Sequence, residues 1–350
     1  MKRILLHIIS LVLFSVPLII KGQLSTYVTD ISLPTSIAFQ GDSLYVCEYG
    51  SDLVSIYDCS GITPLLVDSI TGLNGCAKIV FHNNFAYVAE YLDSKISKFD
   101  YTQTNPTITD VITGLNGPFS LAFKGDELFI AEMDGNTISK LDVSNSNPII
   151  TNVISGLNRP VEIAFNNDDL YICEYFSNKV SKIDVTLPIP VLTNVVTNVN
   201  SPIGLVFNGD NLYISENYLN KIIQINIADT IPIKSDIVST SDPLRMAFYG
   251  LDLYITNYGV NRISKYYSPL LSAEKSHLDT DFILFPNPTK NYIQIIGNNV
   301  SKRYSIYNIY GSLINGGEIS GDNKIVVQEF EPGIYVLFLD NGKSVKFIKE

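Results

Sequence analysis

The stretch that decides the fold reads Pro118-Phe119-Ser120-Leu121-Ala122-Phe123-Lys124-Gly125-Asp126-Glu127-Leu128-Phe129-Ile130-Ala131-Glu132. Two β-rich apolar runs flank a Lys-Gly-Asp turn, in which glycine supplies the positive φ that a tight hairpin needs. The phenylalanine that ends the first run recurs at Phe39, Phe81, Phe123, Phe165, Phe207 and Phe248, in steps of 42, 42, 42, 42 and 41 residues. A period of this length indicates one structural unit used six times.

Each unit reads as four short strands joined by turns. In the third unit the expected strands cover residues 119–123, 128–132, 137–141 and 149–154. Closely spaced turn signals between β-rich runs are typical of an all-β fold with meander connections. We therefore predict an all-β chain.

A single four-stranded meander would leave apolar surface on both faces, so the units must pack against one another. Closure into a ring achieves this, whereas a linear solenoid would need polar capping repeats at its ends. The sixth unit stops after a third strand at Tyr266, and the chain offers a spare strand at 26–29. We predict a six-bladed β-propeller over residues 23–268, closed by that spare strand, with each repeated phenylalanine in the core.

The first 22 residues have the three-part layout of a secretory signal peptide. Lys2 and Arg3 precede an apolar stretch from Ile4 to Ile20, and we expect cleavage near Gly22. A membrane-anchoring helix is the alternative, but Pro17 and polar residues interrupt a stretch that is already short for a span. No other segment is long and apolar enough, so we expect an exported protein with no integral membrane span.

Acidic residues are concentrated in the propeller region. Residues 23–266 hold 13 basic and 26 acidic side chains, whereas residues 281–350 hold seven of each. Such a field repels phosphate backbones and anionic lipids, which argues against nucleic acid as a partner. Cations and cationic or neutral partners are favoured instead.

Four cysteines in an exported chain suggest disulfides, but the repeat register opposes them. Cys47 and Cys173 occupy the same place in blades one and four, far apart across a ring, while Cys59 and Cys76 fall at opposite ends of their strands. We expect free, mostly buried thiols.

Three recurring motifs carry a resemblance to known propellers: Pro-x-x-Ile-Ala-Phe, Asp-x-Leu-Tyr-Ile-Ala-Glu and Asn-Lys-Ile-Ser-Lys-Ile-Asp. Over residues 24–268 the units resemble NHL-type repeats and the wider group of six-bladed gluconolactonase and regucalcin-like propellers. Where NHL repeats usually have aspartate, this chain has Glu48, Glu90, Glu132, Glu174, Glu216 and, once, Asn257. The lactonase-type resemblance implies a divalent metal at the channel, and only Glu162 loosely matches a ligand position.

Four ordered motifs mark the C-terminal region: Phe285-Pro286-Asn287-Pro288, Tyr307-Asn308-Ile309-Tyr310-Gly311, Pro332-Gly333-Ile334-Tyr335-Val336 and Lys346-Phe347-Ile348-Lys349. With them, residues 281–350 resemble the type A C-terminal sorting domain of the type IX secretion system. The resemblance implies the type IX secretion machinery as a partner, export from a Gram-negative bacterium, and a product that is secreted or held on the outer cell surface.

Strand patterns in the same region predict a small β-sandwich with strands at 292–296, 304–310, 324–327 and 335–339. A linker is expected at 269–280. A structural accessory domain is the alternative to a sorting domain.

One variable position lies early in each innermost strand, at the expected mouth of the central channel. It is the second residue after each proline-type position: Ser36, Lys78, Ser120, Glu162, Gly204 and Arg245. Lys78, Glu162 and Arg245 are candidates to orient a polar or anionic ligand. The alternative is a solvated channel mouth with ion pairs.

A second variable position follows the repeated glutamate: Tyr49, Tyr91, Met133, Tyr175, Asn217 and Tyr258. Its four tyrosines are expected around one rim, where they could stack on sugar rings or grip a peptide, because tyrosine combines apolar area with a polar tip. Alternatively, these tyrosines cover the seams between blades.

The repeated glutamates could gather Ca²⁺ through oxygen ligands. A structural role is the better interpretation, in which each carboxylate accepts backbone N–H bonds in the adjoining turns. We therefore expect no cofactor, with Ca²⁺ as the alternative.

Catalysis lacks its usual parts, because only His82 and His277 follow the signal segment and no Ser-His-Asp set can share one face. The leading interpretation is a secreted or cell-surface binding module for an extracellular protein, peptide or glycan. A metal-dependent hydrolase or lactonase is the alternative, and a passive structural repeat is the third possibility.

Overall fold

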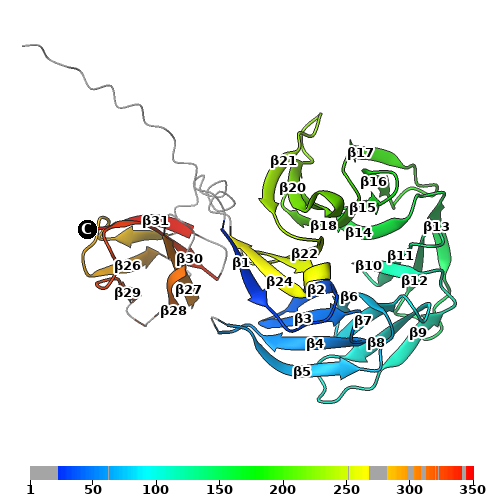
Figure 1. Ribbon diagram of the computed structural model, residues 1–350, viewed down its shortest axis with the longest axis horizontal. Coiled ribbons are helices and arrows are strands. Elements are labelled where there is room, and N and C mark those ends of the chain that lie inside the picture. Colours follow the sequence, from blue (N-terminus) through cyan, green and yellow to red (C-terminus); the bar gives the residue numbers. More distant parts are fainter. Residues whose placement is uncertain are drawn as a thin grey trace, which may run out of the picture.

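The computed structural model describes residues 23–61, 63–250, 252–267, 282–297, 303–308, 313–319, 321, 323–340 and 344–350. Six four-stranded sheets stand around a central axis, and two further sheets form a smaller C-terminal body (Figure 1). The predicted architecture, an all-β six-bladed β-propeller followed by a small β-sandwich, is confirmed.

The elements of blades one to three are β2 (Pro34–Gln40), β3 (Ser43–Glu48), β4 (Leu53–Asp58) and β5 (Leu65–Thr71), then β6 (Cys76–His82), β7 (Phe85–Glu90), β8 (Lys95–Asp100) and β9 (Thr109–Thr113), then β10 (Pro118–Lys124), β11 (Glu127–Glu132), β12 (Thr137–Asp142) and β13 (Thr151–Ser155). Blades four to six contain β14 (Pro160–Asn166), β15 (Asp169–Glu174), β16 (Lys179–Asp184) and β17 (Thr193–Thr197), then β18 (Pro202–Asn208), β19 (Asn211–Glu216), η1 (Asn217–Leu219), β20 (Lys221–Asn226) and β21 (Ser235–Ser239), then β22 (Pro243–Tyr249), β23 (Asp252–Asn257), η2 (Tyr258–Val260), β24 (Arg262–Tyr267) and β1 (Gln23–Val28).

The ring closes through β1. This strand pairs antiparallel with β24 and gives blade six the sheet order β1-β24-β23-β22, which confirms that the spare N-terminal strand completes the last blade. The observed strand begins three residues earlier than the predicted one, because backbone pairing with β24 starts at Gln23 opposite Tyr267. The innermost strands β22 and β2 also contact each other, so the ring is sealed at the axis as well.

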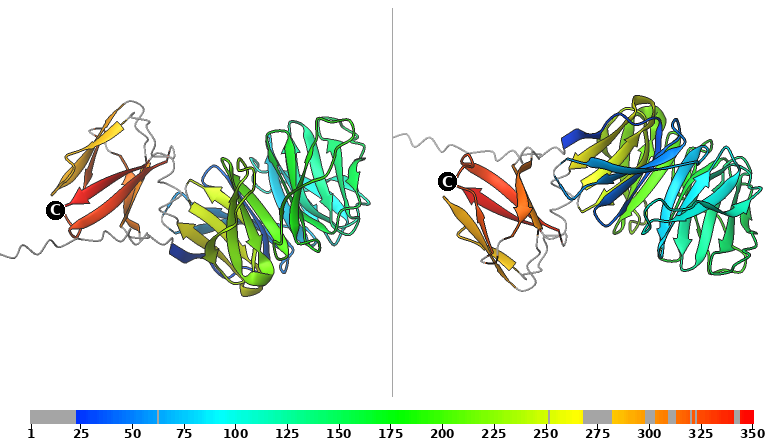
Figure 2. Two further views of the ribbon diagram at one scale, coloured as in Figure 1. Left: turned by 90° about the horizontal axis from the view of Figure 1, so that it is seen from above. Right: turned by 90° about the horizontal axis from the view of Figure 1, so that it is seen from below.

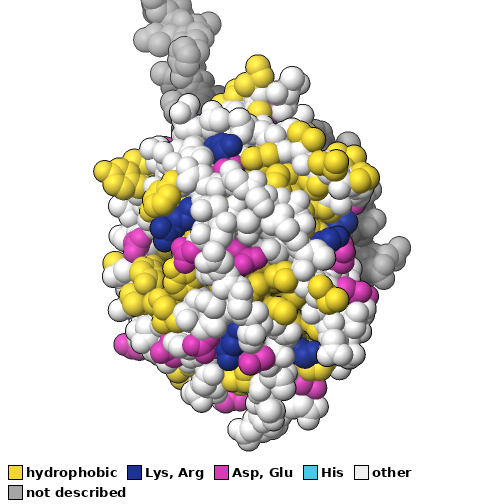
Figure 3. All heavy atoms as spheres, turned by 90° about the vertical axis from the view of Figure 1, so that its right-hand side faces the viewer, with side chains coloured by type: hydrophobic (Ala, Val, Ile, Leu, Met, Phe, Trp, Pro, Cys, Tyr) yellow, Lys and Arg dark blue, Asp and Glu magenta, His cyan; other side chains and the backbone are white. Residues whose placement is uncertain are grey.

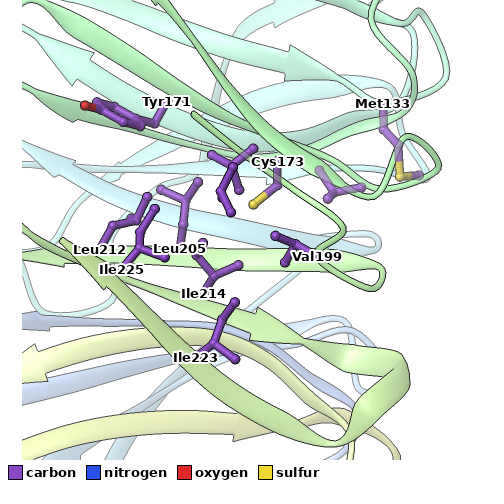
Figure 4. Close-up of a cluster of buried hydrophobic side chains, with 12 residues drawn as sticks. Met133, Tyr171, Cys173, Val199, Leu205, Leu212, Ile214, Ile223 and Ile225 are labelled. Atoms are coloured by element: carbon purple, nitrogen blue, oxygen red, sulfur yellow. The ribbon is translucent and has the colours of Figure 1, made fainter. Parts of the chain in front are cut away.

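Apolar side chains fill the seams between neighbouring blades. Figure 4 shows the cluster between blades four and five, where Tyr171 and Cys173 of β15 meet Leu205 of β18 and Ile214 of β19. All four cysteines are free and buried, as predicted. They act as small apolar side chains in these seams.

The repeated phenylalanines are less buried than the prediction of core residues required. All six are half-buried, and each packs its ring against an aromatic side chain of the preceding blade. Phe165, for example, meets Phe129 edge to face with ring centroids 5.1 Å apart. They end the inner strands near one face of the ring, where the seams open to solvent.

The C-terminal body is a sandwich of two sheets. Its strands are β25 (Phe282–Phe285), β26 (Tyr292–Gly297) and β29 (Lys324–Val326) in one sheet, and β28 (Leu313–Glu318), β27 (Arg303–Asn308), β30 (Gly333–Leu339) and β31 (Ser344–Lys349) in the other. Ile293, Ile306, Leu337 and Phe347 meet between the sheets. The strands β25, β28 and β31 were not predicted, because their sequences lack the clear alternation of apolar and polar residues.

The two bodies touch beside blades one and six (Figure 2). Tyr267 of β24 stacks on Tyr307 of β27 with ring centroids 4.3 Å apart, and Arg303 Nη2 donates to both carboxylate oxygens of Asp42 at 3.2 Å. Asp42 lies in the β2–β3 turn, at the opposite end of its blade from the β3–β4 turn. The contact with the C-terminal body therefore leaves the end with the β3–β4 turns uncovered.

The expected signal peptide (1–22) and linker (269–280) lie outside the described residues. Within the described residues, no helix is long and apolar enough to cross a membrane.

Candidate ligand-binding site

A pocket of about 430 Å³ opens at the end of the ring where the second strand of each blade turns into the third. Its walls are formed by Thr35, Tyr49, Tyr91, Phe119, Met133, Arg159, Val161, Tyr175, Ile203, Leu244 and Tyr258. The four rim tyrosines predicted from the repeat therefore line one pocket. The structure also adds residues from the start of the inner strands, which sequence reasoning did not propose.

A β-bulge near the start of every inner strand shapes the pocket floor. In β10, for example, the pairing with β11 shifts between Pro118 and Ser120, which leaves Phe119 unpaired. A bulged residue is removed from the ladder and its side chain is re-aimed. The bulged residues Thr35, Phe119, Val161 and Ile203 consequently face the pocket.

Arg245 lies beneath this floor and ties the ring together across its axis. Nη1 donates to the carbonyl oxygens of Thr35 (3.1 Å) and Ala77 (2.9 Å), and Nη2 donates to those of Phe119 (2.7 Å) and Val161 (2.9 Å). Nε donates to Glu162, so all five N–H groups of the guanidinium have acceptors. The bulges take these carbonyl oxygens out of the strand pairing. Arg245, from blade six, donates to one carbonyl oxygen in each of blades one to four.

Lys78 and Glu162 belong to the same buried network. Lys78 Nζ donates to Glu162 Oε1, and Ser120 Oγ donates to Oε2 of the same carboxylate at 3.2 Å. Burial lowers the pKa of Lys78, against the opposing effect of Glu162. The three charged residues predicted for the channel mouth are thus brought together, but they bind one another below the pocket wall. Their use in ligand recognition stays a prediction.

Arg159 contributes the one cationic side chain of the pocket wall. It precedes β14 with a φ of +57°, a left-handed conformation that costs a non-glycine residue about 1–2 kcal/mol. Its guanidinium lies over the Phe176 ring, 5.1 Å from the centroid. Sequence reasoning missed it because the position before each inner strand reads as an ordinary turn.

Tyr91 is held by neighbours from the next blade. Its hydroxyl donates to Asp134 at 2.8 Å, and its ring meets Phe119 edge to face at 5.9 Å. Burial and then the Asp134 carboxylate raise the pKa of Tyr91, and the positive charge of Arg159 partly offsets them. The phenol therefore stays protonated at neutral pH and remains a hydrogen-bond donor.

The repeated glutamates are structural, as predicted. Glu90 Oε2 accepts the backbone N–H of Asn74 at 2.8 Å, and its Oε1 accepts the Ser97 hydroxyl. The equivalent backbone bonds reach Glu48, Glu132, Glu174 and Glu216 at 2.7 to 3.2 Å. Each carboxylate thereby fixes the turn before an inner strand. No group of three or more potential metal ligands occurs among the residues described.

Because these carboxylates already have protein donors, we expect EDTA to leave the melting temperature unchanged. The protein to test is the chain without its expected signal peptide, residues 23–350, which we call the exported chain. Differential scanning calorimetry with and without the chelator, together with elemental analysis, would measure this. A lower melting temperature accompanied by release of stoichiometric Ca²⁺ would contradict the structural role.

Sorting-motif residues from the start and the end of the C-terminal region meet in the sandwich. The Asn287 side chain donates to the Lys346 carbonyl oxygen at 3.1 Å and accepts the Ile348 N–H at 2.9 Å, so the motif Pro286-Asn287-Pro288 is tied to β31. Tyr335, two residues after Gly333, is buried and donates to the Glu331 carbonyl oxygen at 2.7 Å. Lys349 is buried and Lys346 exposed, whereas Gly311 lies outside the described residues.

The outer surface of the propeller differs from the pocket. On the side that faces away from the sorting domain, hydrophobic, basic and acidic side chains alternate in small groups (Figure 3). Around the pocket, by contrast, exposed apolar side chains follow the rim positions directly: Leu92 after Tyr91, Phe176 after Tyr175 and Tyr218 after Asn217. Exposed aromatic and apolar side chains therefore extend the pocket rim outward at these three positions.

Residues 283–350 match the family of secretion system C-terminal sorting domains. No curated protein matches the chain in sequence. Among solved structures, a luciferin-regenerating enzyme is similar with a TM-score of 0.59 at 13% identity, covering 71% of this chain and 96% of that chain. Virginiamycin B lyase from Staphylococcus aureus is similar with a TM-score of 0.52 at 15% identity, covering 71% of this chain and 99% of the lyase.

An auxiliary nutrient binding protein from Bacteroides ovatus is similar with a TM-score of 0.58 at 12% identity, covering 70% of this chain and 76% of that protein. At these identities the similarity shows the fold alone. The chain thus joins a six-bladed β-propeller to a C-terminal sorting domain that implies secretion or attachment to the cell surface.

Proposed function

We propose that the propeller is the binding module of an exported protein and that it recognises an extracellular protein, peptide or glycan through the tyrosine-lined pocket. The observation that carries this proposal is the convergence of Tyr49, Tyr91, Tyr175 and Tyr258 on one pocket of about 430 Å³. Tyrosines offer rigid apolar area and a polar tip, which suits both sugar rings and peptide side chains.

The placement of the sorting domain supports this proposal. Its contacts through Asp42 and Tyr267 lie away from the pocket end, so binding is compatible with the full chain. We further propose that residues 1–22 are a signal peptide, that residues 281–350 are recognised by the type IX secretion machinery, and that the product is secreted or held at the outer surface of a Gram-negative cell. The linker at 269–280 would then be the place of separation.

A metal-dependent hydrolase or lactonase is less well supported. Glu162 is the residue that loosely matched a lactonase metal ligand, and both of its oxygens already accept bonds from Lys78, Ser120 and Arg245. Recruiting it to a metal would leave the buried Arg245 without its carboxylate partner, which is costly.

Peptide and glycan arrays probed with the exported chain would identify a ligand, and titration calorimetry would measure its affinity. We expect the double variant Tyr91→Ala/Tyr175→Ala to weaken binding at least about tenfold, since each buried aromatic contact contributes about 1 kcal/mol. Leu66→Ala, an exposed side chain on β5 at the outer edge of blade one, is the control and should bind normally. Equal affinity of the double variant and the unchanged chain would contradict the proposal.

A further inference from the structure

Resting on the proposed function, we infer that the pocket takes an amphipathic organic anion: an apolar ring or chain that carries a carboxylate, with the carboxylate bound by Arg159. The inference depends on four features of the site. They are the backbone conformation of Arg159, its lack of an ion pair, the charge beneath the pocket, and the apolar character of the remaining wall.

The backbone at Arg159 is one that glycine adopts more easily. The equivalent position before each inner strand has a φ between 48° and 67° in every blade: Leu33, Gly75, Gly117, Arg159, Ser201 and Asp242. Blades two and three use glycine there. The other blades have leucine, glycine, serine or aspartate at this turn, so the fold does not need arginine there, yet Arg159 places a long cationic side chain in the pocket wall.

Arg159 also lacks an anionic partner inside the protein. Across the described part of the chain, no carboxylate forms an ion pair with it, although residues 23–266 hold 26 acidic and 13 basic side chains. The neighbouring Asp134 accepts the Tyr91 hydroxyl, and Phe176 supports the guanidinium plane. The donors of Arg159 are thus available to a ligand, and a planar guanidinium suits a carboxylate.

The buried network below the pocket floor carries a positive charge, as Arg159 does. Lys78 and Arg245 face the single carboxylate of Glu162, so the buried network carries one net positive charge. Arg245 also lies under the Phe119 ring, 4.7 Å from the centroid. The acidity of the domain as a whole favours neutral or cationic partners, but the network directly beneath the pocket floor adds a positive charge.

Most of the remaining wall is apolar. Phe119, Met133, Val161, Ile203 and Leu244 offer no polar side-chain group to a ligand, and the tyrosines offer single hydroxyls. A sugar buried here would leave many hydroxyls without partners, which is unfavourable. An apolar group joined to one carboxylate fits both parts of the wall. Such chemistry is found in a peptide that ends in an apolar residue and in a free aromatic or aliphatic acid.

The exported chain, residues 23–350, should be titrated calorimetrically with phenylbutyrate and with phenylbutanol, which keeps the ring but lacks the charge. We expect the acid to bind at least about tenfold more tightly, as for a hydrogen-bonded charged pair. In Arg159→Gly the preference should disappear while the melting temperature does not fall, since glycine already occupies this turn in blades two and three. Lys140→Gln, which removes a positive charge on β12, should keep the preference.

A second comparison separates the two sources of the anion. N-acetyl-phenylalanine and a short peptide ending in phenylalanine, each as free acid and as amide, represent a chain terminus. Tighter binding of the peptide acid than of phenylbutyrate assigns the site to peptide C-termini, and the reverse assigns it to free acids; either result supports the inference. Stronger binding of glucuronate than of phenylbutyrate would overturn it in favour of an acidic glycan.

The assignment of an anionic ligand can fail while the proposed binding function still holds. Equal affinity for phenylbutyrate and phenylbutanol, or an unchanged preference in Arg159→Gly, overturns the anion assignment, while loss of binding in Tyr91→Ala/Tyr175→Ala still supports a pocket that binds ligands. If the tyrosine variant leaves all binding unchanged, both proposals fall.

Discussion

Arg245→Met is expected to lower the free energy of unfolding by about 3–5 kcal/mol, the cost typical of breaking a buried charged network. Methionine fills much of the same volume but donates no hydrogen bonds. The carbonyl oxygens of Thr35, Ala77, Phe119 and Val161 would lose their donor, and buried acceptors without partners are destabilising. Chemical denaturation of the exported chain, followed by far-UV circular dichroism, would measure the change.

The companion variants separate charge from hydrogen bonding. Arg245→Lys keeps the charge near Glu162 but cannot reach four carbonyls at once, so it should remain clearly destabilised. Adding Glu162→Gln to Arg245→Met should not recover the loss, because it removes the carboxylate that still pairs with the buried Lys78. A stability of Arg245→Met within about 0.5 kcal/mol of the unchanged chain, the range of ordinary surface substitutions, would show that the network contributes little.

The buried arginine also explains why blade five has glycine, Gly204, at the repeat position that Arg245 occupies in blade six. A Cβ built on Gly204 would lie 2.2 Å from the Leu244 carbonyl oxygen and 3.0 Å from the Arg245 Cα. Such approaches exclude any side chain. The backbone of blade six can therefore approach the axis closely enough for Arg245 to reach the opposite blades.

Much of the fold could be predicted because the repeat is nearly exact in length. A fixed step sets six equal blades, and counting strands at both ends identifies the closing one. The half-burial of Phe165 and its equivalents could not be predicted, since it depends on how far each seam opens toward one face. Within the C-terminal sandwich, β25, β28 and β31 escaped prediction because their sequences lack a clear alternation.

The candidate site was predictable only where it follows the repeat. The rim tyrosines occupy one repeat position, so their convergence follows from the symmetry of a ring. The burial of Lys78, Glu162 and Arg245 does not follow from that symmetry. It arises from the bulges, which take carbonyl oxygens at the axis out of the strand pairing. Arg159 was missed for a different reason: its position reads as an ordinary turn in the sequence, and only the structure places its side chain in the pocket wall.

Deleting Gln23–Val28 is expected to lower the stability of the exported chain by at least about 4 kcal/mol. Val28 is 5% exposed and packs among the cluster that joins blades one and six, and Tyr27 meets Tyr254 edge to face at 4.8 Å. Full burial of one such side chain contributes about 1.5–3 kcal/mol, and the half-buried Tyr27 adds to the contribution of Val28. The ladder with β24 is lost in addition, and the exposed edge of β24 would invite association between molecules.

Calorimetric melting and size-exclusion chromatography of the chain that begins at Thr29 would measure both effects. For a domain of this size the loss corresponds to a melting temperature lower by about 10 °C or more. Ser25→Ala is the matched control, because its exposed side chain makes only a 3.5 Å bond to the Lys265 carbonyl oxygen while the backbone ladder stays intact. If the shortened chain melts like the control and stays monomeric, β1 does not stabilise the closure of the ring. The inner strands and Arg245 would then be sufficient to close it.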